Sequence, residues 1–187
     1  MGRPKQTLVI EGVPMLERVL RTFRSSKVGR VVVVLGAHAA EVRKEVEFTD
    51  EVVAENPKFS EGMSESLKLG LGKVEGAEAA IIALGDQPFV QPGTIDEMIK
   101  AYERTKARIV IPTYRGTRGN PVLFDRSVFP QIKGIRGDVG AKSVVQRNAA
   151  DVLEVEVHDI GVLMDIDTAS DLGRRAGFRK RRTRGRA

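Results

Sequence analysis

The sequence predicts an α/β fold, a doubly wound and mostly parallel sheet with helices on both faces. Two patterns indicate this fold. Short apolar runs of the length of strands alternate with segments in which apolar residues recur every three or four positions, as in amphipathic helices. The clearest runs are apolar throughout and do not alternate with polar residues, so both faces of the sheet are expected to be covered.

Six segments are predicted strands. Three segments, at residues 30–35, 79–84 and 108–112, contain uninterrupted apolar runs that indicate burial on both faces; the first and third begin with an arginine. The other three are weaker candidates, at residues 51–54, 121–124 and 152–157. The segments between these strands are expected to be helical.

Helical periodicity supports this expectation. Apolar residues recur on one face from Val13 to Phe23, and Pro14 falls in the first turn, where its missing N–H costs little. A second helix is predicted behind Thr94 as its N-cap, with apolar residues on one face as far as Tyr102. Further helices are predicted at residues 37–47, 60–74 and 140–147, and a last one at Thr168, with Asp171 three residues on as in a capping box.

Composition narrows the class of protein. The chain of 187 residues, with 41% hydrophobic and 30% charged residues, is expected to form one globular domain with a sizeable core. It has no cysteine, which excludes disulfides, cysteine-ligated zinc, iron–sulfur clusters and thiol catalysis. Neither a membrane span nor a secretory signal is visible, so a cytoplasmic protein is predicted.

The net charge of +6 comes from the carboxyl end of the chain. Residues 174–187 contain eight basic residues and no acid, which leaves 23 basic against 25 acidic residues in the rest of the chain. We therefore predict a folded domain over residues 1–177 and a basic, disordered tail over residues 178–187. Because the tail has Phe178 as its one aromatic residue, it offers no stacking platform, and nucleic acid is not an expected partner.

Carboxylates follow two apolar segments, at the edge of the sheet where doubly wound folds bind ligands. Asp86 comes directly after the strand predicted at 79–84 and could hold a hard cation, or it could cap the next turn. Asp165 and Asp167 end another apolar segment and would share one face of a strand, where a bound Mg²⁺ would relieve their repulsion. Alternatively, Asp167 begins a helix with Thr168 and Asp165 is solvated.

Glycine-rich segments precede two predicted helices. Residues 55–67 contain several Gly and Ser residues at a predicted helix start. Free backbone N–H groups there could bind a phosphate or the edge of a base. The alternative is a Ser-capped helix that packs against the core. In residues 134–140, Gly137 and Gly140 would permit close backbone approach, and Arg136 could meet an anionic substrate; the alternative is a flexible loop. A catalytic histidine or serine is not expected, since neither residue type has a triad-like context.

Together these segments resemble the MobA-like nucleotidyltransferases, and within them the molybdenum cofactor cytidylyltransferases. The resemblance implies a Rossmann-like fold and transfer of a nucleoside monophosphate from an NTP to a phosphate-bearing acceptor, with Mg²⁺ and release of pyrophosphate. The matching stretches span nearly the whole chain in the expected order: Met1-Gly-Arg-Pro-Lys5, Asn56-Pro57, Glu61-Gly-Met-Ser-Glu-Ser-Leu67, Leu84-Gly-Asp-Gln-Pro88, Gly119-Asn-Pro-Val-Leu-Phe124, Gly137-Asp-Val-Gly-Ala141 and Asp165-Ile-Asp-Thr168.

The resemblance also implies roles for individual residues. Lys5 resembles the lysine that neutralises the triphosphate, and it and Asp86 would be the catalytic residues. Asp86 and Asp167 resemble the two Mg²⁺ ligands, with Asp165 as a rival for the second position. Nucleotide binding falls to Gly2, Lys5, Asn56, Gly62, Met63 and Ser66, and acceptor binding to Asn120, Gly137 and Asp138.

Two departures from the family pattern bear on function. The family begins with a strand and a Gly-rich loop, whereas this chain starts at the Met-Gly that follows them, so we expect that the true start codon lies upstream. Asn120 stands where many cytidylyltransferases have His, which leaves the acceptor, expected to be of the molybdopterin type, less defined.

The resemblance leaves more than one nucleotide substrate and more than one class of activity open. The form of the motif Leu84-Gly-Asp-Gln-Pro88 resembles that of the cytidylyltransferases, which favours CTP over GTP as the nucleotide substrate. A GTP-using enzyme, a sugar-1-phosphate nucleotidyltransferase, or a non-catalytic nucleotide-binding or partner subunit are the alternatives to a cytidylyltransferase.

Overall fold

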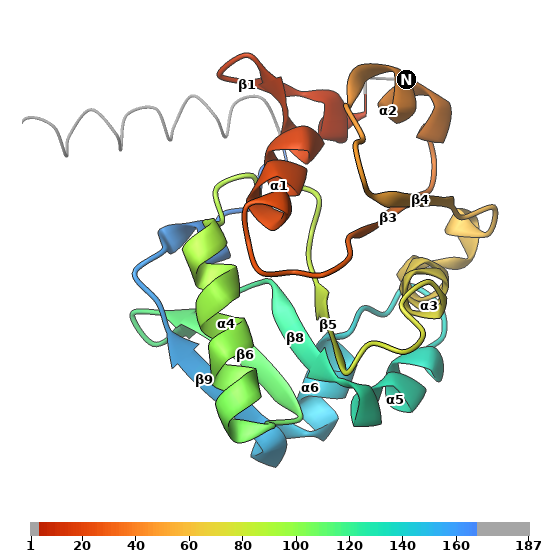
Figure 1. The fold of residues 1–187 in the computed structure, drawn as a ribbon. Coiled ribbons are helices and arrows are strands. Elements are labelled where there is room, and N and C mark those ends of the chain that lie inside the picture. Colours follow the sequence, from red (N-terminus) through yellow and green to blue (C-terminus); the bar gives the residue numbers. More distant parts are fainter. Residues whose placement is uncertain (1–3, 168–187) are drawn as a thin grey trace, which may run out of the picture.

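The computed structural model describes residues 4–167, which form the predicted α/β fold, with helices packed on both faces of a central sheet (Figure 1). In chain order the elements are η1 (Lys5–Thr7), β1 (Val9–Ile10), β2 (Val13–Pro14), α1 (Met15–Arg24), β3 (Val32–Leu35), α2 (Ala39–Glu45), β4 (Val52–Glu55), η2 (Phe59–Glu61), α3 (Met63–Gly72), β5 (Ala79–Ile82), α4 (Pro92–Thr105), β6 (Ile109–Tyr114), β7 (Thr117–Arg118), β8 (Val122–Asp125), η3 (Arg126–Val128), α5 (Phe129–Lys133), α6 (Lys142–Arg147), η4 (Ala149–Asp151), β9 (Val152–Glu156) and η5 (Ile160–Leu163).

The strands form a larger and a smaller sheet, beside the β1–β2 hairpin. In the smaller sheet β3 and β4 pair in parallel. In the larger sheet β6 pairs in parallel with β9, and β8 lies antiparallel between β5 and β6. The strands β5, β6 and β9 therefore run in one direction, and their carboxyl ends meet at one edge, where ligands bind in such sheets.

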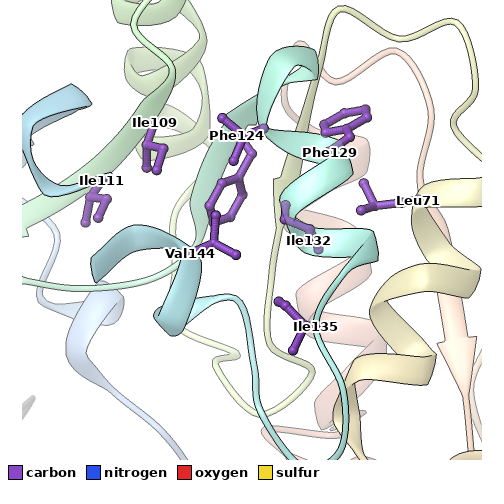
Figure 2. Close-up of a cluster of buried hydrophobic side chains, with 9 residues drawn as sticks. Leu71, Ile109, Ile111, Phe124, Phe129, Ile132, Ile135 and Val144 are labelled. Atoms are coloured by element: carbon purple, nitrogen blue, oxygen red, sulfur yellow. The ribbon is translucent and has the colours of Figure 1, made fainter. Parts of the chain in front are cut away.

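The buried side chains of β6 show why its apolar run does not alternate with polar residues. Ile109 and Ile111 belong to a cluster with the helices α5 and α6, in which Phe124 and Ile132 are also fully buried (Figure 2). Val110, between them in the sequence, packs in a separate cluster with side chains of α4. Because successive strand residues point to opposite faces, helices on both faces bury every position, as the sequence predicted.

All six predicted strands are confirmed, but three local predictions are wrong. Pro14 ends β2 and is the N-cap residue of α1, so it lies before the first turn of that helix and not in it. The helix α4 begins at Pro92 with Gln91 as N-cap residue, so Thr94 lies inside the first turn and does not cap it. Residues 162–167 form no strand, because η5 covers Ile160–Leu163 and the rest has no regular structure. The helix predicted at Thr168 and the basic tail lie outside the described residues.

The two sheets are separated by a cavity of about 1680 Å³ between β3 and β5. Each of these strands has one ladder partner, β4 or β8, and residues 4–167 supply none for its other edge. The cavity is lined by both strands and by apolar residues of α1 and α3. As a result the apolar residues of β5 are each only partly buried, whereas those of β6 from Ile109 to Ile111 are fully buried.

Tyr102 on α4 makes the stability of the fold depend on pH in the alkaline range. Its hydroxyl donates a hydrogen bond to Asp125 Oδ2 at 2.7 Å, and burial together with that bond raises the pKa of Tyr102 to about 12. The unfolded phenol ionises near pH 10, so the folded state holds this proton more tightly between pH 10 and 12. We expect the free energy of unfolding to fall over that window, and less steeply in Tyr102→Phe.

Urea unfolding of the wild type and Tyr102→Phe at pH 8, 10 and 11.5 measures this difference. At pH 8 the substitution should cost about 1 kcal/mol, the usual value of one buried hydrogen bond. Tyr114→Phe changes the other tyrosine of the chain and is the matched control. Identical pH slopes for the wild type and Tyr102→Phe would contradict the assignment.

Candidate active site

Three charged side chains converge at the carboxyl end of β5. Lys5 in η1 places its Nζ 2.7 Å from Asp86 Oδ2 and 3.0 Å from Asp167 Oδ1. Asp86 lies four residues beyond the end of β5, and Asp167 lies at the end of the described chain. Asp86 is 81 positions from Lys5 in the sequence and Asp167 is 162 positions from it, yet both carboxylates contact the same Lys5 Nζ atom.

The electrostatics of this cluster favour a bound cation. Burial opposes the charged form of Lys5, but the hydrogen bonds and charges of Asp86 and Asp167 outweigh burial and raise the pKa of Lys5 above its usual value. Asp86 Oδ1 is buried and has no hydrogen-bond partner among residues 4–167. Two carboxylates facing one point, with a buried oxygen still unpaired, are a donor set that fits a hard divalent ion.

Residues 159–167, which we call the strap, deliver the second and third carboxylates. Ile166 is fully buried, and its N–H donates to Asp86 O at 2.9 Å, while Asp165 and Asp167 on either side of it are exposed. Asp165 Oδ1 accepts a hydrogen bond of 2.5 Å from Gln87 Nε2. Asp167 therefore converges with Asp86 on Lys5, while Asp165 is bonded to the neighbouring glutamine.

Asn56 and Ser66 lie together at the carboxyl end of β4. Asn56 is 5% exposed, donates to Ser66 Oγ at 3.0 Å and accepts the N–H of Lys58 at 2.9 Å. The backbone N–H of Asn56 extends the parallel ladder by donating to Leu35 O. This network fixes the loop that connects β4 to α3.

The amino-terminal end of α3 packs against the loop that contains Gly137 and Asp138. Ser64 N donates to Gly137 O at 3.2 Å, and Met63 N contacts Asp138 Oδ1 at 3.4 Å. A Cβ atom at Gly62 would lie 2.4 Å from the backbone carbon of Gly137. The prediction of free N–H groups at this helix start is therefore wrong for Met63 and Ser64, whose donors are occupied by the loop.

The remaining predicted site residues have different locations. Asn120 N donates to Val162 O at 2.9 Å, so Asn120 contacts the strap. Gly2 lies outside the described residues. Sequence reasoning missed Gln87, which is 4% exposed, and Asp159, which is 6% exposed. Gln87 is marked in the sequence only by its place beside Asp86, and Asp159 only by its place before an apolar run. Neither signal is distinctive.

Comparison with known proteins identifies the family. The MobA-like NTP transferase domain matches residues 1–152, which is most of the chain. The chain belongs to the MobA-like NTP transferase family. This domain is a Rossmann-like nucleotidyltransferase at the family level, in agreement with the fold and with the resemblance in its motifs.

Proteins of similar length resemble this chain in sequence or in structure. Purine catabolism protein PucB of Bacillus subtilis (strain 168) is 30% identical over 195 residues, which covers 94% of this chain and 90% of PucB. The crystal structure of Rv0371c from Mycobacterium tuberculosis H37Rv is 29% identical, with a TM-score of 0.81 over 93% of this chain and 89% of that chain. Rv0371C has also been solved in complex with manganese, a structure with 31% identity and a TM-score of 0.78 over 92% and 91% of the two chains. A divalent metal is consistent with this family.

In the part of the chain that the structure describes, no helix has the length and apolar character needed to cross a membrane.

Proposed function

We propose that this MobA-like domain transfers CMP from CTP to a phosphate-bearing acceptor of the molybdopterin type and releases pyrophosphate. The observation that carries the proposal is the convergence of Lys5, Asp86 and Asp167 at the carboxyl end of β5. Transfer to an acceptor phosphate needs positioning and charge neutralisation more than proton removal, because the attacking oxygen is already anionic. A site of one lysine and carboxylates suits that chemistry.

Asp86 and Asp167 are the proposed ligands of Mg²⁺, and Lys5 is the proposed partner of the triphosphate. Bound Mg²⁺ would supply neutralisation of phosphate charge and in-line orientation. The unpaired Asp86 Oδ1 supports this assignment, as does the manganese in the related Rv0371C structure. In the metal-bound protein the Lys5 ammonium would be released from the carboxylates and would pair with phosphate oxygens.

The two predicted binding regions would adjoin each other at the start of α3. We assign the base and ribose to the side formed by Asn56, Gly62, Met63 and Ser66; Gly2, which lies outside the described residues, is also a proposed nucleotide-binding residue. Gly137 and Asp138 would contact the acceptor, with Asn120 beside the strap. The contact between Ser64 and Gly137 supports this assignment, because it places the two regions next to each other.

Thermal unfolding with Mg²⁺ and each of CTP, GTP, ATP and UTP tests the proposal. A ligand at a hundred times its dissociation constant stabilises the native state by about 2.7 kcal/mol, which raises the midpoint measurably. We expect the largest rise with CTP and its loss in Asp86→Ala. A rise with GTP alone would favour a guanylyltransferase, and binding without pyrophosphate release would favour a non-catalytic subunit.

The cavity between β3 and β5 supports a second element of the proposal, an additional strand supplied ahead of Met1. Such a strand could pair with the unpartnered edges of β3 and β5 and would lead into the Gly-rich loop that the family resemblance implies. Repeating the nucleotide scan with the upstream codons included tests this. A CTP response that appears only in the extended chain would assign triphosphate binding to the added segment.

The second metal ligand can be assigned by paired substitutions in the strap. We expect Asp167→Asn to weaken Mn²⁺ binding about tenfold or more, because Asp167 shares the cation position with Asp86. Asp165→Asn should have a smaller effect, since its Oδ1 accepts from Gln87. Titration of Mn²⁺ by electron paramagnetic resonance measures both variants, and the reverse order of effects would make Asp165 the ligand.

A further inference from the structure

Asp159 is a buried carboxylate at the start of the strap. Its Oδ2 accepts hydrogen bonds from Gln91 N at 2.8 Å and from Thr94 Oγ1 at 2.7 Å, and its Oδ1 accepts from Gly161 N at 2.9 Å. Both Asp159 and Thr94 are less than a tenth exposed. One side chain therefore ties the beginning of the strap to the first turn of α4.

Close backbone contacts hold the strap beyond Asp159. A Cβ atom at Gly161 would lie 2.2 Å from Phe89 O, and one at Gly119 would lie 2.4 Å from Val162 O. Substitution at either glycine would therefore force backbone atoms apart. The strap is thus seated against the loop after β5 on one side and the loop before β8 on the other.

The carboxyl end of the strap carries the charged groups of the site. The backbone of Ile166 is bonded to Asp86 O, and Asp167 reaches the Lys5 ammonium. Six residues separate Asp159 from Ile166, and η5 occupies Ile160–Leu163 of that interval. A short segment therefore connects Asp159 to Asp167.

We infer that Asp159 is a positioning residue, which fixes the strap so that Asp165 and Asp167 lie at the correct distance from Asp86. The consequence for metal binding rests on the proposed function, whereas the placement of the strap does not. Carboxylates that orient metal ligands through hydrogen bonds typically change metal affinity 10–100-fold when they are altered. Three donors face the carboxylate, and the amide of Asn would put its own NH₂ against at least one of them.

Asp159→Asn is the test variant, with Asp125→Asn as the matched control. Asp125 also accepts hydrogen bonds from a backbone N–H, of Ser127, and from a hydroxyl, of Tyr102. It pairs with Ala79 at the amino end of β5, opposite to Asp86. Both variants should lose stability, so a general loss of stability is accounted for.

Two readouts, taken well below both unfolding midpoints, separate positioning from stability. Hydrogen–deuterium exchange of residues 160–167 should accelerate at least tenfold in Asp159→Asn and stay at the wild-type rate in Asp125→Asn. The dissociation constant of Mn²⁺ should rise about tenfold in Asp159→Asn and stay within twofold in Asp125→Asn. Unchanged exchange in the strap of Asp159→Asn would overturn the inference.

The same data separate failure of the inference from failure of the proposed function. Faster exchange in the strap with unchanged Mn²⁺ affinity would also overturn the inference, because the strap would then not set the metal site. If the wild type bound no Mn²⁺ and released no pyrophosphate from CTP, the proposed function would fail. Faster exchange in Asp159→Asn would then still establish that Asp159 positions the strap.

Discussion

Asp86→Asn is expected to lower kcat/KM for CTP by about 10³-fold, or about 4 kcal/mol of transition-state stabilisation. Asp86 offers the cation position both an oxygen bonded to Lys5 and a buried oxygen with no partner among the described residues. Asn retains the shape of the side chain but removes its charge. Pyrophosphate release at saturating Mg²⁺ measures the effect.

Asp50→Asn is a matched control for this change. Asp50 is exposed and lies in the turn before β4, away from the cluster of Lys5 and Asp86. It should retain wild-type activity. Both variants should unfold within about 1 kcal/mol of the wild type, because a partly exposed ion pair contributes little to stability. A fivefold or smaller loss of activity in Asp86→Asn would contradict the proposed catalytic role of Asp86.

Gly62→Ala is expected to destabilise the fold by about 3 kcal/mol. Gly62 has φ of 110° and ψ of 173°, a region that residues with a Cβ scarcely enter. The added Cβ would also meet backbone atoms of Gly137 and Asp138 at 2.4–2.6 Å. Because these atoms are backbone, they cannot rotate away, and the contact between α3 and the loop must open. Urea unfolding measures the loss.

Gly12→Ala separates strain from collision. Gly12 also has a positive φ, of 83°, but a Cβ there would have nothing within 4 Å. It should cost about 1 kcal/mol from backbone strain alone and leave nucleotide binding unchanged. Gly62→Ala should in addition weaken the thermal response to CTP. Equal losses of stability in the two variants would show that the contact with Gly137 is not tightly packed.

The order of strands and helices, and the position of one catalytic candidate, could be predicted from local sequence alone. Burial on both faces favours an unbroken apolar run, as at Ile109–Ile111 in β6, and an amphipathic helix favours a repeat of three or four. Both patterns appear in the local sequence. Asp86 could be identified because it lies in the loop just after β5, whose carboxyl end lies at the ligand-binding edge of such sheets. The motifs of the family then added Lys5.

The tertiary structure alone decided which distant groups meet. Asp165 and Asp167 are equivalent in the sequence pattern, and only the seating of the strap directs Asp167 to Lys5 and Asp165 to Gln87. The donors at the start of α3 are taken by a loop more than seventy residues away. Local sequence fixes backbone preference over a few residues, whereas these contacts depend on how segments far apart in the chain pack against each other.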